Sequence, residues 1–144
     1  MRVIALDTES TGLSFQHDRL VELAALEFDP LTGEVGRTFH RYVNPQRPVP
    51  AAAVEVHGLT DAFLADKPPF AEVADELLGF VSGAAAVIHN ARFDVGFLEA
   101  ELKRIKAASF SESVVRVEDT LAMSRRSVKA KKHTLDALCD RFGV

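Results

Sequence analysis

The sequence has a single cysteine, no excess of positive charge and no long apolar run. With only Cys139, the chain cannot form an internal disulfide or a metal site built from several cysteines. Because 17 basic residues face 21 acidic ones, the net charge of −4 argues against a polybasic binder of nucleic acid or membranes. No run approaches the roughly 18 apolar residues of a membrane span, and the amino end lacks a secretory signal, so we expect a cytoplasmic protein.

The residues that are present favour one α/β domain over residues 1–144. Strand-like runs at 3–6, 19–28 and 37–43, joined by short polar turns, predict an antiparallel meander. After a proline-rich loop at 44–50, helical periodicity alternates with strand-like segments at 84–88 and 114–117. The predicted fold is therefore a mixed sheet, with the meander followed by parallel strands, flanked by helices. The predicted helices cover 70–81, a segment with Val95, Leu98, Leu102 and Ile105 as core residues, 120–127, and a last helix with Leu135, Leu138, Cys139 and Phe142 on its buried face.

Carboxylates occur where two of the predicted strands end. Asp7 and Glu9 follow the first buried strand with a spacing of two, which places both on one face of the sheet. Asp94 lies near the start of the helix after the strand at 84–88, where a carboxylate can also serve as a simple helix cap. If the two strands are neighbours, the three carboxylates form a cluster that favours Mg²⁺ or Mn²⁺.

Three motifs in order resemble those of the DnaQ-like 3′-to-5′ exonucleases, a family of the DEDD superfamily with a ribonuclease H-like fold. They are DTESTG at 7–12, VHGLT at 56–60 and HNARFDVGFL at 89–98. Connecting segments at 66–77, 119–125 and 135–142 are similar to the proofreading subunits of bacterial replicative DNA polymerases. The resemblance covers nearly the whole chain.

The resemblance implies a site of two divalent ions, Mg²⁺ or Mn²⁺, held by Asp7, Glu9 and Asp94. Such a pair of ions can activate water and stabilise the leaving 3′-oxygen of a phosphodiester. It also implies that the terminal nucleotide contacts a further set of residues: Thr8, Leu13, His57, Asn90 and Phe93. For His57 a turn residue and for Phe93 a core residue are the plain alternatives.

The resemblance further implies a histidine general base and a last aspartate ligand on a helix after the segment at 135–142. The chain ends at Val144, so no general base is assigned, and we expect a domain that is incomplete at its carboxyl end. A general base contributes a factor of about 10² to 10⁴, so weak activity is expected. His133 precedes that segment and does not take this place, and Asp136 and Asp140 are explained as solvated residues.

A dense basic run includes Arg125, Arg126, Lys129, Lys131 and Lys132. It is either a solvated loop or a segment that follows phosphates.

The expected function is a DNA 3′-to-5′ exonuclease in proofreading or repair that releases nucleoside 5′-monophosphates. Its expected partners are single-stranded or frayed DNA 3′ ends and a replicative polymerase subunit, with no membrane. Two alternatives stay open: an RNA-trimming exonuclease of the same fold, and a noncatalytic module that binds nucleic acid or a polymerase.

Overall fold

The computed structural model describes all residues from 1 to 144. Its five strands form one sheet in the order β3-β2-β1-β4-β5. The strands are β1 (Val3–Ser10), β2 (Leu20–Phe28), β3 (Val35–Tyr42), β4 (Ala85–Ile88) and β5 (Arg116–Asp119). The helices are α1 (Ala51–His57), α2 (Asp61–Leu64), α3 (Phe70–Val81), α4 (Ala91–Arg104), α5 (Phe110–Ser113), α6 (Thr120–Ser127) and α7 (Leu135–Phe142).

The predicted mixed sheet is confirmed. β1, β2 and β3 pair antiparallel, whereas β4 pairs parallel with β1, and β5 pairs parallel with β4. The first strand is longer than its apolar run predicts, because β2 pairs with β1 as far as Ser10. The polar residues from Asp7 onward are therefore part of the strand and keep its alternation of faces.

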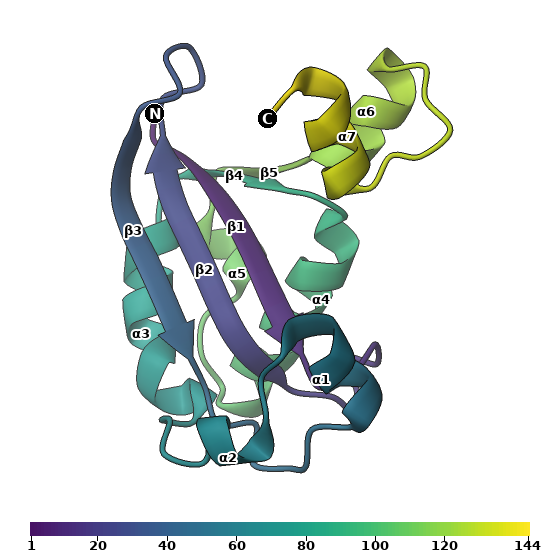
Figure 1. Ribbon diagram of the computed structural model, residues 1–144. Coiled ribbons are helices and arrows are strands. Elements are labelled where there is room, and N and C mark those ends of the chain that lie inside the picture. The colour runs from purple at the N-terminus through teal and green to yellow at the C-terminus, as the bar shows by residue number, and fades with distance from the viewer.

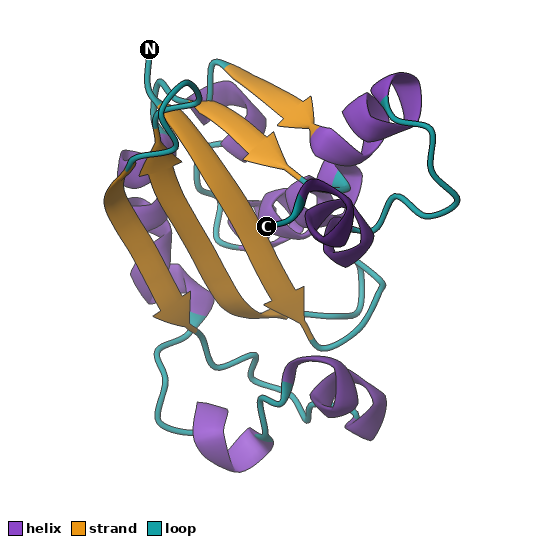
Figure 2. Ribbon diagram, turned by 45° about the horizontal axis from the view of Figure 1, so that its top comes forward, coloured by secondary structure: helices purple, strands orange, loops and turns teal.

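The helices cover the two faces of the sheet unequally. Figure 1 shows α3, α4 and α5 behind the sheet, while no helix lies over the front of β2 and β3. The segments α6 and α7 stand beyond the β4–β5 side, and α1 and α2 lie near the carboxyl end of β1 (Figures 1 and 2). One face of the meander is thus open, a common property of antiparallel sheets.

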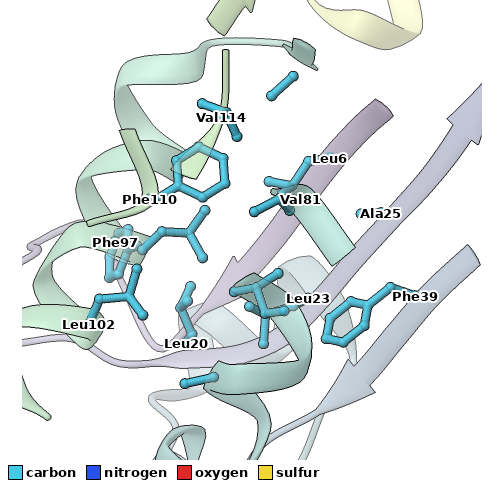
Figure 3. Packing of buried hydrophobic residues seen from close by; sticks show 14 of the residues in the cluster. Leu6, Leu20, Leu23, Ala25, Phe39, Val81, Phe97, Leu102, Phe110 and Val114 are labelled. Carbon is cyan, nitrogen blue, oxygen red and sulfur yellow. The ribbon is translucent and has the colours of Figure 1, made fainter. Parts of the chain in front are cut away.

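The core lies between the sheet and the helices on its covered face. Inward residues of β1 and β2, including Ile4, Leu6 and Leu23, pack with Phe97 of α4 and Phe110 of α5. Figure 3 shows Leu6 and Leu23 of the sheet and Phe97 and Phe110 of the helices converging from the two layers. Since inward and outward residues alternate along β1, burying Leu6 and Thr8 leaves Asp7 on the open face.

The last helix differs from its sequence-based prediction. Leu138 of α7 is buried, but Leu135 is 53% exposed, Phe142 is 64% exposed and Cys139 is only partly buried. The prediction of a fully buried apolar face with Cys139 in it was wrong, because α7 packs beside α6 rather than under the sheet. The short helices α1, α2 and α5 were also missed, because four to seven residues carry too little periodicity.

None of the helices is long and apolar enough to span a bilayer.

Candidate active site

The carboxyl end of β1 presents carboxylates on the open face of the sheet. Asp7 is exposed and Glu9 is half-buried, and Thr8 between them points inward and is buried. The antiparallel register places Glu22 of β2 directly opposite Glu9. Glu22 was missed in the sequence because only the strand register reveals it, and it binds His40 of β3 at 2.7 Å.

A single aspartate holds the junction through which the chain enters α4. Asn90, the residue before α4, adopts a left-handed conformation with φ of 65°. The Asp119 carboxylate accepts hydrogen bonds from the backbone N–H groups of Asn90 and Ala91, both at 3.1 Å. It also accepts from the N–H groups of Leu121 and Ala122 at the start of α6. Asp119 therefore caps two helices at once, and it fixes the first turn of α4.

That first turn brings Asp94 to β1. Asp94 is 3% exposed, and its Oδ1 accepts hydrogen bonds from the Thr8 N–H at 3.0 Å and from the Thr8 hydroxyl at 2.8 Å. β4 pairs with β1 only as far as Ala5, so the Thr8 amide lies past the end of β4 and is free to meet this side chain. β1 and β4 are neighbours, as the sequence predicts. Thr8 donates its hydrogen bonds to Asp94 from the buried face of β1.

Desolvation, with help from neighbouring carboxylates, raises the pKa values of the site carboxylates. Burial raises the pKa of Asp94 to about 6, with a further contribution from the charge of Asp7. Partial desolvation raises the pKa of Asp7, aided by Glu22, although the Thr8 N–H and His89 oppose the rise. Desolvation also raises the pKa of Glu9, and Asp7 and Glu22 add to the effect. The site concentrates negative charge that a bound cation would offset.

The side chains meet the chemical needs of a hard divalent cation, but they do not form one closed coordination sphere. No group of three or more His, Cys, Asp or Glu side chains lies close enough to hold a single ion. Because Asp94 Oδ1 is directed at Thr8, the three carboxylates interact as separate groups in the structure. Their role as ligands shared between two ions stays a prediction. Asp94 Oδ2 accepts no hydrogen bond from another residue, so an oxygen ligand remains on each carboxylate.

The raised pKa of Asp94 predicts how the stability of the metal-free protein depends on pH. A raised carboxylate pKa favours the protonated folded state, so this contribution is full below pH 3.8 and is lost as pH rises through about 6. Asp94→Asn keeps the acceptor for Thr8 and removes the charge. Urea unfolding in a chelator should show the variant to be more stable than wild type at pH 7.5, by at most about 3 kcal/mol, with the difference vanishing near pH 4.

The matched control is Asp75→Asn, which removes an exposed carboxylate of α3. If both variants follow the wild-type pH profile, the buried charge of Asp94 does not limit stability.

The other predicted site residues are distributed around this edge. Leu13 lies in the loop after β1 and is 84% exposed. Asp18 holds that loop by accepting hydrogen bonds from the Thr11 hydroxyl and the Ser14 N–H. Asn90 is exposed beside β4. Leu13 and Asn90 are thus the predicted contact residues that a ligand can reach freely.

His57 reaches the same edge from α1, but its ring nitrogens are occupied. Its Nδ1 accepts a hydrogen bond from the Leu59 N–H at 3.1 Å, so its Nε2 carries the proton and donates to the Ser10 carbonyl at 3.0 Å. Gly58 follows with φ of 75°, a conformation that glycine adopts without strain. His57 therefore fastens α1 to the end of β1, and its ring carbons are left for other contacts.

Phe93 belongs to a small aromatic cluster. Its ring centroid lies 5.0 Å from that of Phe97 and 6.2 Å from that of Phe15, and it is partly buried. A Cβ at Gly96 would come within 2.5 Å of the Phe15 ring, so the absence of a side chain there lets Phe15 lie against α4. Phe93 thus packs partly in the core next to the candidate site.

A groove runs over the open face from Asp7 toward α7. It has a volume of about 470 Å³, and its floor includes Ala5, Ala24 and Val87, with Leu135 of α7 on its rim. Asp7 and His89 supply polar groups at its lining. An apolar hollow with a few polar groups is typical of ligand sites, and this one adjoins the carboxylates.

Residues 4–144 match the RNase T family, which is described as exonuclease. The chain belongs to this exonuclease family. The matched region includes Asp7, Glu9 and Asp94 and both helices that Asp119 caps. The carboxylate edge is therefore the candidate active site of an exonuclease domain.

Several curated relatives of this exonuclease-family chain are DNA polymerase III epsilon subunits. The subunit from Pasteurella multocida is 43% identical over 99% of this chain and 58% of its own length. The subunit from Escherichia coli K12 is 41% identical over 99% of this chain and 61% of its own length. The chain therefore spans about three-fifths of the length of these relatives.

Solved structures support the fold. Escherichia coli exonuclease I in complex with a dT13 oligonucleotide has a TM-score of 0.84 at 18% identity, covering 96% of this chain and 35% of the other. Exonuclease X in complex with 5′-overhanging duplex DNA has a TM-score of 0.72 at 23% identity, covering 99% and 74%. The ribonuclease H-like architecture expected from the sequence is thereby confirmed.

Proposed function

We propose that this protein is a 3′-to-5′ exonuclease that removes nucleotides from DNA ends as nucleoside 5′-monophosphates during replication proofreading or repair. The observation that carries the proposal is the set of interacting carboxylates Asp7, Glu9 and Asp94 at the carboxyl ends of neighbouring strands in an exonuclease-family domain. The similarity to polymerase III epsilon subunits supports DNA as the substrate and a replicative polymerase subunit as a partner.

Asp7, Glu9 and Asp94 are the residues that would hold divalent ions, Mg²⁺ or Mn²⁺, and we propose two such ions. When bound, they supply charge to activate water and to stabilise the leaving 3′-oxygen. The chain's own contribution is positional. Thr8 sets the orientation of Asp94 through two hydrogen bonds, and the strand geometry of β1 keeps Asp7 and Glu9 on one face.

The terminal nucleotide would lie between the loop after β1 and the start of α4. Exposed Leu13 offers an apolar contact for the terminal base, and the ring carbons of His57 offer another from α1. Asn90 has a free side-chain amide at the start of α4, and partly buried Phe93 shapes the floor beside it. Thr8 contributes to this nucleotide site indirectly, because its hydroxyl donates a hydrogen bond to Asp94. A single-stranded or frayed 3′ end fits such an open edge.

The proposal is tested with the full-length gene product and single-stranded DNA carrying a label at either end. With Mn²⁺, the 3′-labelled strand should release labelled nucleoside 5′-monophosphate at once, whereas the 5′-labelled strand should shorten stepwise. Because the activity needs the ions, a chelator should stop release completely, and added Mn²⁺ should restore it.

The direct comparison is an RNA strand of the same sequence. Faster release from RNA would contradict the choice of DNA as substrate. Release that continues in the chelator would contradict the metal-dependent mechanism.

A further inference from the structure

A second pocket adjoins the candidate active site on the side of α6 and α7. It has a volume of about 480 Å³, and its lining includes Asn90, Arg125, Lys131 and His133, with no carboxylate. We call it the basic pocket. His89 and Leu135 line both the basic pocket and the groove that contains Asp7, so the two hollows adjoin.

The positive charge at this pocket is not neutralised by the protein. Arg125 and Lys131 belong to the segment 125–132, which contains five basic residues and no acidic one. None of the five forms an ion pair in the structure, although most arginines elsewhere in the chain do. In a chain with a net charge of −4, a local group of free cations points to an anionic ligand.

The pocket is also held in shape by hydrogen bonds that converge on His133. The His89 Nε2–H donates to the His133 carbonyl at 2.8 Å, since a carbonyl can only accept. The His133 ring lies 3.0 Å from the Ser124 hydroxyl of α6, whose own proton goes to the Leu121 carbonyl. These bonds fasten His133 to the end of β4 and to α6, so the loop 128–132, which carries Lys131, is held at both of its ends.

The walls supply neutral donors as well. Asn90 is exposed with no hydrogen bond to its side-chain amide, while its backbone N–H is taken by Asp119. Two cations and a free amide around one hollow suit the non-bridging oxygens of a phosphate. The apolar floor of the adjoining groove suits the sugar and base that connect one phosphate to the next.

We propose that the basic pocket binds a phosphodiester of the substrate strand that lies on the 5′ side of the bond cleaved at Asp7 and Glu9. This inference rests on the proposed exonuclease function. Arg125 and Lys131 bind the phosphate oxygens. The pocket therefore holds the strand that remains after each nucleotide leaves.

The test uses single-stranded DNA in which one phosphodiester at a time is replaced by an uncharged methylphosphonate. Binding is measured by fluorescence anisotropy with Mg²⁺ in an Asp7→Asn background, which keeps the strand intact. One or two adjacent replacements should weaken binding by about tenfold, because they remove a charged contact. The double variant Arg125→Ala/Lys131→Ala should bind unmodified DNA about tenfold more weakly and show no such position dependence.

The matched control is Arg126→Ala/Lys132→Ala, which removes the same charge from the same segment outside the pocket lining. It should keep the position dependence. The slope of log affinity against log salt should fall by about 0.7 for each lost phosphate contact in the pocket variant. Equal behaviour of the two double variants, or no position dependence in the parent, would overturn the proposal in favour of diffuse attraction.

The two hypotheses can fail separately. If both double variants shorten the strand as fast as wild type and bind DNA equally well, the phosphate pocket is rejected and the exonuclease function is kept. If binding depends on which phosphodiester is replaced but the wild-type protein releases no nucleotide, the exonuclease function is rejected and the phosphate pocket is kept.

Discussion

Asp7→Asn is expected to reduce release of nucleotides from DNA by at least about 10³-fold. Ion-based stabilisation of the transition state amounts to several kcal/mol, and each 1.36 kcal/mol corresponds to a factor of ten in rate. The charge of Asp7 raises the pKa of both Asp94 and Glu9, so Asp7 is the carboxylate that interacts with each of the other two. The measurement is the initial rate of monophosphate release from a 3′-labelled strand under saturating Mn²⁺.

The stability of the Asp7→Asn variant separates this effect from misfolding. Because desolvation and Glu22 raise the pKa of Asp7, removing its charge should leave the metal-free protein as stable as wild type or more stable at pH 7.5. Asp75→Asn, on the exposed side of α3, should retain full activity. A folded Asp7→Asn variant that keeps more than a tenth of the activity would contradict the assignment of Asp7.

Glu101→Ala should cause a large loss of stability, about 3 to 5 kcal/mol. Glu101 is 1% exposed, and its two oxygens accept from Arg19 Nε at 2.7 Å and Nη2 at 2.9 Å. It also accepts from the Leu20 N–H at 3.2 Å and lies 3.3 Å from Arg104. The substitution leaves Arg19 without its carboxylate and the buried Leu20 N–H without an acceptor, and it removes one of the partners of Arg104. It also opens a cavity between α4 and β2.

Thermal and urea unfolding measure this loss, and a fall in Tm of roughly 10 °C or more is expected. Glu101→Gln keeps the shape and one acceptor for Leu20, so it should lose less. Glu55→Ala removes an exposed helical carboxylate of α1 and should change stability by less than about 0.5 kcal/mol. If Glu101→Ala were as mild as Glu55→Ala, the buried ion pair would not support the fold.

The sheet and its major helices were predictable because their patterns are long and local. The apolar runs of the first two strands mark them as strands of the sheet, and the stripe of Phe70, Val73 and Leu77 reports which side of its helix faces the core. The spacing of Asp7 and Glu9 likewise predicted a shared face, and the neighbouring positions of β1 and β4 brought Asp94 near them.

Other parts of the site depend on contacts that no local pattern records. Glu22 becomes a neighbour of Glu9 only through the antiparallel register, and His57 reaches Ser10 across 47 positions of the chain. Thr8 was expected to contact a nucleotide, but the structure places its side chain under Asp94. Asp119 lies between the strand predicted at 114–117 and the helix predicted at 120–127. It could not be recognised as a shared helix cap, because its four donors come from the starts of two separate helices.

The position of Asp119 bears on the spacing between the two places where a nucleic-acid strand would bind. Its carboxylate accepts hydrogen bonds from the starts of both α4 and α6. α4 carries Asp94, and α6 carries Arg125. Together with the pairing of β4 and β5, this side chain helps to set the separation between the carboxylate edge and the basic pocket, although it lines neither. If a strand occupies both, the number of nucleotides between the held phosphate and the cleaved bond is fixed by how rigidly α4 and α6 are joined, and Asp119 is one of those joints.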